Sequence, residues 1–137
     1  MGQTAQVKYQ GSLRTLATHL RSSTNIITDA PVDNNGKGEA FSPTDLVATA
    51  LASCLITIMG IKASKMGVNI DGAAAEIEKI MDSNPRRIKE VKVVVTMPTH
   101  TSYEAKDKKI LEAAARTCPV ALSLHPETIQ TIDFIWS

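Results

Sequence analysis

The sequence has few aromatic residues and almost no net charge, and both shortages exclude common classes of partner. Only 4% of the 137 residues are aromatic, too few to stack the bases of single-stranded nucleic acid. Fifteen Lys and Arg balance fourteen Asp and Glu, which leaves +1 at pH 7 and no basic stripe or polybasic patch. We therefore expect neither nucleic acid nor a membrane as a partner.

Cysteine and histidine are also scarce, and their spacing argues against a disulfide scaffold or a metal site. Cys54 and Cys118 lie 64 residues apart, and neither belongs to a C-x-x-C motif. The three histidines are scattered and form no H-x-x-x-H or C-x-x-H group, so we expect no bound metal. The first ten residues have no apolar core, so we predict no signal peptide and a cytoplasmic protein with reduced thiols.

Residues 46–61 contain no formal charge, although 21% of the chain is charged. Ser42, Pro43 and Asp45 precede this run as an S-x-x-D capping signal, and Gly67 follows it as a stop signal. Sixteen residues fall short of the roughly 20 that cross a bilayer, so the run predicts a core helix. A helix that is apolar on every side must be buried on every side, which indicates that a second subunit supplies part of the cover.

The remaining periodicity predicts an α+β fold with a single domain, residues 1–137. Alternating segments predict strands at residues 3–10, 13–20, 24–29, 68–81, 88–97 and 128–136. Further helices are predicted at 103–117 and 119–124. Residues 30–41 contain an N-N-G-K-G cluster that predicts an irregular loop, either a functional lid or a plain connection.

Both cysteines are predicted on buried faces of the two long helices, where simple packing is their commonest role. Cys118 directly precedes Pro119, so its sulfur is expected at a helix N-terminus, a placement that lowers the pKa of a thiol. Cys54 lies about three turns beyond its own helix N-terminus, where the helix dipole has faded. If Cys54 is a nucleophile, a cation from elsewhere in the chain must activate it.

The candidate cations for Cys54 are the arginines Arg14, Arg21, Arg86, Arg87 and Arg116. Arg14 lies in a predicted strand, on the face that also carries Leu16 and Thr18, from which a guanidinium can turn inward. An exposed charge on that strand is the alternative interpretation of Arg14. The others are weaker candidates, because they fall in turns or, for Arg116, on a different side of the second long helix.

Four motifs identify a family resemblance that extends over essentially the whole chain. FSPTDLVATALASCL surrounds Cys54, RTCPV surrounds Cys118, GSLRT contains Arg14, and SLHPE follows near the end. Together they resemble the OsmC/Ohr family of osmotically inducible and organic-hydroperoxide-resistance proteins, and more narrowly its OsmC-like branch. The resemblance implies the OsmC/Ohr-like fold, a stress-response role, and an intertwined homodimer with curved antiparallel sheets around two long buried central helices.

The resemblance also implies an antioxidant enzyme that reduces organic or lipid hydroperoxides. Cys54 matches the family's peroxidatic cysteine, which becomes a sulfenic acid, and Cys118 matches the resolving cysteine, which then forms a disulfide. No bound cofactor is implied. The reductant is an external dithiol, a lipoylated protein in characterised members. The alternative is an OsmC-like dimer with little or no catalytic activity that senses redox state or binds an apolar ligand.

The sequence departs from the peroxidases of this family at the start of the long helix. Those enzymes hold the activating arginine, for which Arg14 is the best match, with a Glu after the helix-opening proline. Thr44 stands at that place here. The predicted supporting acid is therefore Asp45 or Glu39, with a purely capping role as the alternative for Asp45.

Overall fold

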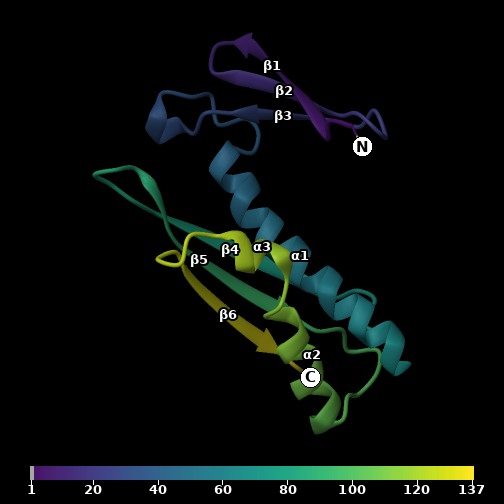
Figure 1. The fold of residues 1–137 in the computed structure, drawn as a ribbon. Coiled ribbons are helices and arrows are strands. Elements are labelled where there is room, and N and C mark those ends of the chain that lie inside the picture. Colours follow the sequence, from purple (N-terminus) through teal and green to yellow (C-terminus); the bar gives the residue numbers. More distant parts are fainter. Residues whose placement is uncertain (1) are drawn as a thin grey trace. The chain divides into compact units, whose positions relative to one another are not determined.

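The computed structural model describes residues 2–137 and confirms the predicted order of strands and helices (Figure 1). The strands are β1 (Ala5–Gly11), β2 (Arg14–His19), β3 (Asn25–Asp29), β4 (Ala74–Asp82), β5 (Arg87–Thr96) and β6 (Ile129–Ile135). The helices are α1 (Pro43–Met66), α2 (Ala105–Ala115) and α3 (Pro119–Ser123), with a short 3-10 turn at Val32–Asn34 inside the predicted loop. One compact unit ends at Leu46, and the other runs from Val47 to Ser137. That the chain acts as one domain stays a prediction.

The first unit contains an antiparallel sheet in the order β1-β2-β3. Ser12 and Leu13, at φ 55° and 63°, form the two-residue turn between β1 and β2, one position later than the sequence signal suggested. The register places Arg14 of β2 directly opposite Asp29 of β3. Direct cross-strand neighbours share a face of the sheet, so this register brings an arginine and a carboxylate together.

The second unit contains the sheet β4-β5-β6, in which β4 and β5 are antiparallel while β5 and β6 are parallel. The expectation of a purely antiparallel sheet is therefore wrong. The connection from β5 to β6 runs through α2 and α3, and a helical crossover of this length permits parallel pairing. The predicted strand at 68–81 also begins too early, because Asn69 turns the chain by accepting the Asp71 N–H at 2.7 Å.

The apolar core of the second unit lies between α1, the sheet and α2. Val91, Val93, Val95 and Met97 are buried, in the alternation that the sequence predicted for this strand. They meet a stripe on α1 whose buried residues recur at helical spacing: Ala48, Leu51, Ala52, Leu55, Met59 and Ala63.

The predicted start and stop signals of α1 are confirmed. The Asp45 N–H donates to Ser42 Oγ at 3.1 Å, and the Ser42 N–H donates to Asp45 Oδ2 at 2.9 Å, which is a reciprocal capping box. At the other end, Gly67 has φ 70°, and the N–H groups of Gly67 and Val68 donate to the carbonyls of Ser64 and Ala63. This Schellman motif satisfies the last carbonyls of the helix.

Within this chain α1 is only partly buried, and that a second subunit covers the rest stays a prediction. Only the stripe described above is buried, and Ile61 on another side is 50% exposed, so within this chain the helix is not covered on every side. At 24 residues α1 is longer than its uncharged run, and by length and hydropathy alone it passes the test for a membrane span. The core helix of a folded domain passes the same test, and the buried stripe places α1 in a core.

We expect Ser42→Ala to lower the free energy of unfolding by about 1 kcal/mol, because an alanine cannot accept the Asp45 N–H. Urea denaturation of the two proteins measures the difference. The matched control is Ser53→Ala on the same helix, where the serine is exposed and alanine is the better helix former, so we expect no loss. Equal losses in both variants would contradict the capping role of Ser42.

Candidate functional site

Cys54 lies near the middle of α1 and is partly exposed. It packs at the edge of the core, next to the buried stripe that faces the sheet. Cys54 is a free thiol in this structure.

Cys118 is fully buried, at 0% exposure, and caps the N-terminus of α3. Its Sγ accepts the backbone N–H of Ala121 at 3.3 Å, and Pro119 occupies the first turn. The predicted position at a helix N-terminus is therefore confirmed.

The predicted consequence for the Cys118 thiol is wrong, because its pKa is raised. Burial is the main cause, and it outweighs the Ala121 N–H, which acts in the opposite direction. The Cys54 thiol contributes to the same rise, so the two side chains are close enough to interact. The fold thus brings together the two cysteines of the sequence, which are 64 residues apart, while Cys118 stays protonated at neutral pH.

Arg14 forms a bidentate ion pair with Asp29 in the first unit. Its Nε donates to Asp29 Oδ1 at 2.7 Å, and its Nη2 donates to Asp29 Oδ2 at 2.8 Å. The Arg14 Nη2 also donates to Glu39 Oε1 at 3.0 Å, and the Glu39 N–H donates to Asp29 Oδ2 at 3.1 Å. Arg14 is therefore held in one orientation by two acids and is not a free strand charge.

The electrostatics of this group follow from its geometry. The pKa of Asp29 is lowered mainly by the hydrogen bonds from Arg14. Burial acts in the opposite direction but has a smaller effect. Asp29 in turn raises the pKa of Arg14, so the guanidinium stays charged at every accessible pH. We call Arg14, Asp29 and Glu39 the arginine cluster.

Of the two acids predicted to support Arg14, the structure pairs Glu39 with it. The carboxylate of Asp45 accepts the Ser42 N–H in the capping box, as the capping interpretation of Asp45 predicts. The Thr44 hydroxyl, at the place of the family's Glu, is 3.3 Å from Ser42 Oγ. Arg116, another candidate cation, stacks over the ring of Phe134 at 5.9 Å.

Asp29 is the main partner of Arg14, and it was not predicted from the sequence. A signal was available, because Asp29 ends a predicted strand that follows the strand of Arg14 in a meander. An acid and an arginine at the same end of two paired strands become neighbours once the register is fixed. The register could not be read from the sequence with enough accuracy to use that signal.

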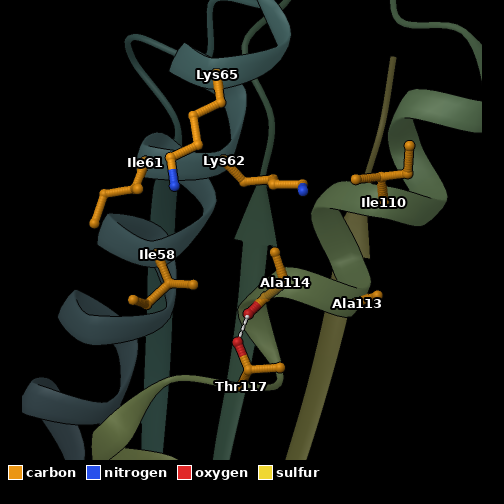
Figure 2. A pocket seen from close by; sticks show the side chains of 8 residues that line it. All are labelled: Ile58, Ile61, Lys62, Lys65, Ile110, Ala113, Ala114 and Thr117. Atoms are coloured by element: carbon orange, nitrogen blue, oxygen red, sulfur yellow. Dashed lines mark hydrogen bonds between the residues drawn. The ribbon is translucent and has the colours of Figure 1, made fainter.

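A groove of about 480 Å³ lies between α1 and α2 in the second unit (Figure 2). Its walls are aliphatic, formed by Ile58 and Ile61 of α1 and by Ile110, Ala113 and Ala114 of α2. Ile58, which lines the groove, follows Cys54 by one turn of α1. Among residues 2–137 no group of three or more His, Cys, Asp or Glu side chains is placed to hold a metal ion.

Comparison with known proteins places this chain in a family. The family model for OsmC-like proteins matches residues 36–132. A solved structure from Psychrobacter arcticus, with a proposed role in osmotic stress and detoxification, is 52% identical, with a TM-score of 0.92 over 98% of this chain and 96% of that one. A comparison with curated proteins found no significant match.

More distant solved structures share the fold. The organic hydroperoxide resistance protein OsmC of Legionella pneumophila is 16% identical, with a TM-score of 0.76 over 98% of each chain. The organic hydroperoxide resistance protein OhrB of Bacillus subtilis is 18% identical, with a TM-score of 0.67 over 96% of this chain and 98% of that one. The fold is therefore the α+β fold of OsmC and Ohr structures. The chain belongs to the OsmC-like family.

Proposed function

We propose that this protein is a thiol-dependent peroxidase that reduces organic hydroperoxides with Cys54 and Cys118. The observation that carries the proposal is the interaction between these two cysteines, distant in sequence, of which Cys54 is partly exposed and Cys118 is buried. The family includes members named for organic hydroperoxide resistance, which supports the same reaction.

In the first step, the Cys54 thiolate attacks the outer oxygen of the hydroperoxide. The S–O bond forms as the O–O bond breaks, and the departing alkoxide takes a proton to become the alcohol. Cys54 is thereby oxidised to a sulfenic acid, and the hydroperoxide is reduced. An aliphatic groove whose wall begins one turn of α1 after Cys54 favours an organic substituent over hydrogen peroxide.

In the second step, Cys118 attacks the sulfenic sulfur of Cys54. An S–S bond forms, the S–O bond breaks, and the hydroxyl leaves as water with the proton of Cys118. The raised pKa of Cys118 keeps it a thiol until this step, which suits the resolving role better than the peroxidatic one. An external dithiol, in the form of a lipoylated protein, then reduces the disulfide and is itself oxidised. No bound cofactor takes part.

Arg14 is the residue that we propose to stabilise the Cys54 thiolate and the developing charge on the peroxide oxygens. Asp29 and Glu39 act as positioning residues, because their hydrogen bonds fix the direction of the guanidinium. In the family's peroxidases a Glu at the position of Thr44 holds the activating arginine. In this protein Asp29 has that role. A positive charge held in place without rearrangement is the kind of group that stabilises a transition state most effectively.

We also propose that the protein works as a homodimer in the cytoplasm. Among the described residues, every buried hydrophobic side chain lies in the second unit, while the sheet of the first unit exposes apolar ones. Val7, Tyr9 and Ile26 share one face of that sheet, and Tyr9 is 67% exposed. Exposed apolar faces of this kind on a three-stranded sheet and on α1 require a partner surface, which a second copy supplies.

The second candidate function is an OsmC-like protein with little or no catalytic activity that senses redox state or binds an apolar ligand. Thr44 in place of the family's Glu and the aliphatic groove favour it. The two candidates differ in what hydroperoxide does to the protein, because a ligand-binding protein with inert thiols stays reduced.

We expect one equivalent of cumene hydroperoxide to convert the reduced protein to a form with an intramolecular Cys54–Cys118 disulfide. Intact-mass measurement detects the loss of two hydrogens, and peptide mapping locates the bond. Treatment with dihydrolipoamide should restore both thiols. A protein that stays reduced, or one that accumulates sulfenic acid without the disulfide, would refute the two-cysteine cycle and favour the binding function.

A further inference from the structure

We propose that Gly36 is a further positioning residue of the reaction, because it lets residues 30–41 fold into a fixed clamp on Arg14. This inference rests on the proposed peroxidase function and adds a residue that acts through others in the same loop. The sequence left two interpretations of this loop, a lid and a plain connection, and the contacts support neither. All the contacts between Gly36 and the guanidinium lie within the first unit.

The base of the loop is tied to itself and to the strand that carries Arg14. The Asp29 N–H donates to the Phe41 carbonyl at 3.1 Å, which closes the loop. The Ala30 N–H donates at 3.0 Å to the carbonyl of Leu13, the residue before Arg14. Both are bonds between backbone groups, so the base of the loop is held in the same way as the strands of the sheet.

The returning limb of the loop brings Glu39 to the arginine cluster. The Gly38 N–H donates to the Ala30 carbonyl at 3.2 Å, and the Glu39 N–H donates to Asp29 Oδ2 at 3.1 Å. Glu39 thus holds Arg14 with its carboxylate and Asp29 with its backbone. If this limb moved away, the buried Asp29 would lose one of the donors that fix its carboxylate.

Gly36 determines how closely the returning limb can approach Ala30. The Gly36 N–H donates to the Pro31 carbonyl at 2.9 Å. A Cβ at position 36 would overlap the carbonyl group of Ala30 and would lie 2.6 Å from its Cα. These are backbone atoms, so rotation of a side chain cannot make room. The φ angle of Gly36 is outside the left-handed region, so space alone requires glycine here.

Any side chain at position 36 must therefore displace either this limb or Ala30. The Ala30 carbonyl accepts the Gly38 N–H, and the next residue is Glu39, so the displacement reaches the arginine cluster within three residues. A loop that opened as a lid would break the same bonds. The loop is thus built as a clamp that keeps the guanidinium in one orientation, which is what preorganised charge stabilisation requires.

The test is Gly36→Ala, for which we expect kcat/KM for cumene hydroperoxide to fall about tenfold, because the guanidinium loses its fixed direction. Alkylation of Cys54 by iodoacetamide should slow as well. In an Arg14→Gln background the same change should have no further effect on either rate, because Gly36 acts only through Arg14. Gly2→Ala is the matched control and should keep wild-type rates. It adds the same methyl group where, among the described residues, no heavy atom outside its chain neighbours lies within 4 Å.

Wild-type rates in Gly36→Ala, or losses that add to those of Arg14→Gln, would overturn the inference. Hydrogen exchange of the wild type tests the clamp even if the variant fails to fold. The amides of Gly38 and Glu39 should exchange at least about tenfold more slowly than in an unfolded chain, and unprotected exchange, as in an open lid, would overturn the inference.

Failure of the proposed function looks different, because then the wild type itself turns over no hydroperoxide. The exchange measurement still decides about the clamp in that case. Protection of the Gly38 and Glu39 amides that is lost in Gly36→Ala supports it, and protection that is absent from the wild type or unchanged in the variant overturns it.

Discussion

Replacing Cys54 with serine is expected to reduce hydroperoxide turnover to the uncatalysed background, a loss of at least about a thousandfold. A serine hydroxyl is almost fully protonated at neutral pH and is a far weaker nucleophile toward oxygen than a thiolate. Cys54 is the partly exposed member of the pair, so no other thiol in the chain can replace it. Stopped-flow consumption of cumene hydroperoxide with dihydrolipoamide as reductant measures the effect.

Cys118→Ser is the matched variant, because it makes the same atomic change at the buried partner. We expect it to keep a first turnover at nearly the wild-type rate and to accumulate Cys54 sulfenic acid, which dimedone traps. In the wild type, disulfide closure should become faster as the pH rises, because burial keeps Cys118 protonated beyond the ordinary thiol pKa of about 8.5. Wild-type turnover by Cys54→Ser would exclude the proposed mechanism, and loss of the first turnover in Cys118→Ser would reverse the assigned roles.

Arg14→Gln is expected to lower kcat/KM for cumene hydroperoxide by about a hundredfold, the usual effect of removing a preorganised charge donor from a reacting centre. Glutamine keeps a similar length but has neither the charge nor the two-pronged pairing with Asp29. Alkylation of Cys54 by iodoacetamide should slow in the same variant. This second measurement separates an effect on the thiolate from an effect on substrate binding, which alkylation does not report.

The same variant tests the arginine cluster through the pH dependence of stability. Arg14 holds the pKa of Asp29 below its unfolded value of about 3.9, so the pairing stabilises the folded state above that pH and is lost as the pH falls through the folded pKa. In Arg14→Gln, Asp29 at 1% exposure has lost its cation. We expect a deficit in unfolding free energy that is largest near pH 7 and that shrinks as the pH falls below about 3.9 toward the folded pKa of Asp29.

Glu39→Gln is the control for both measurements on Arg14. The Glu39 side chain is 66% exposed and makes one contact with Arg14, while the pair with Asp29 stays intact. Exposed ion pairs contribute little, so stability should change only slightly and activity by only a few-fold. A stability deficit of Arg14→Gln that does not shrink as the pH falls, or a Glu39→Gln variant as inactive as Arg14→Gln, would contradict the roles assigned within the arginine cluster.

Local signals in the sequence were sufficient to predict the order of the strands and helices. The alternation of Val91, Val93 and Val95 with polar neighbours predicted β5, and the capping box of Ser42 and Asp45 predicted the start of α1. These signals are reliable because they act between residues at most a few positions apart, whose geometry is fixed by one element. The family motifs around Cys54 and Cys118 predicted the OsmC/Ohr-like α+β fold, which the comparisons confirm.

The predictions that failed were those that depend on contacts between distant segments of the chain. The parallel direction of β6 depends on the path of the α2–α3 crossover, and the pairing of Arg14 with Asp29 depends on a strand register that a shift of one residue would destroy. The pKa of Cys118 was misjudged because the helix N-terminus was visible in the sequence and the burial of the sulfur was not.

The sequence by itself determined that α1 is a capped, uncharged helix with a thiol at its middle and that a second thiol precedes a proline. These properties are local, because each depends on residues that are only a few positions apart in the chain. Only the tertiary structure decided that the two thiols meet, that Asp29 is the main acid holding Arg14, and that Gly36 lies against the backbone of Ala30. Burial and pairing depend on which distant surfaces come into contact, and the packing of the folded chain sets those contacts.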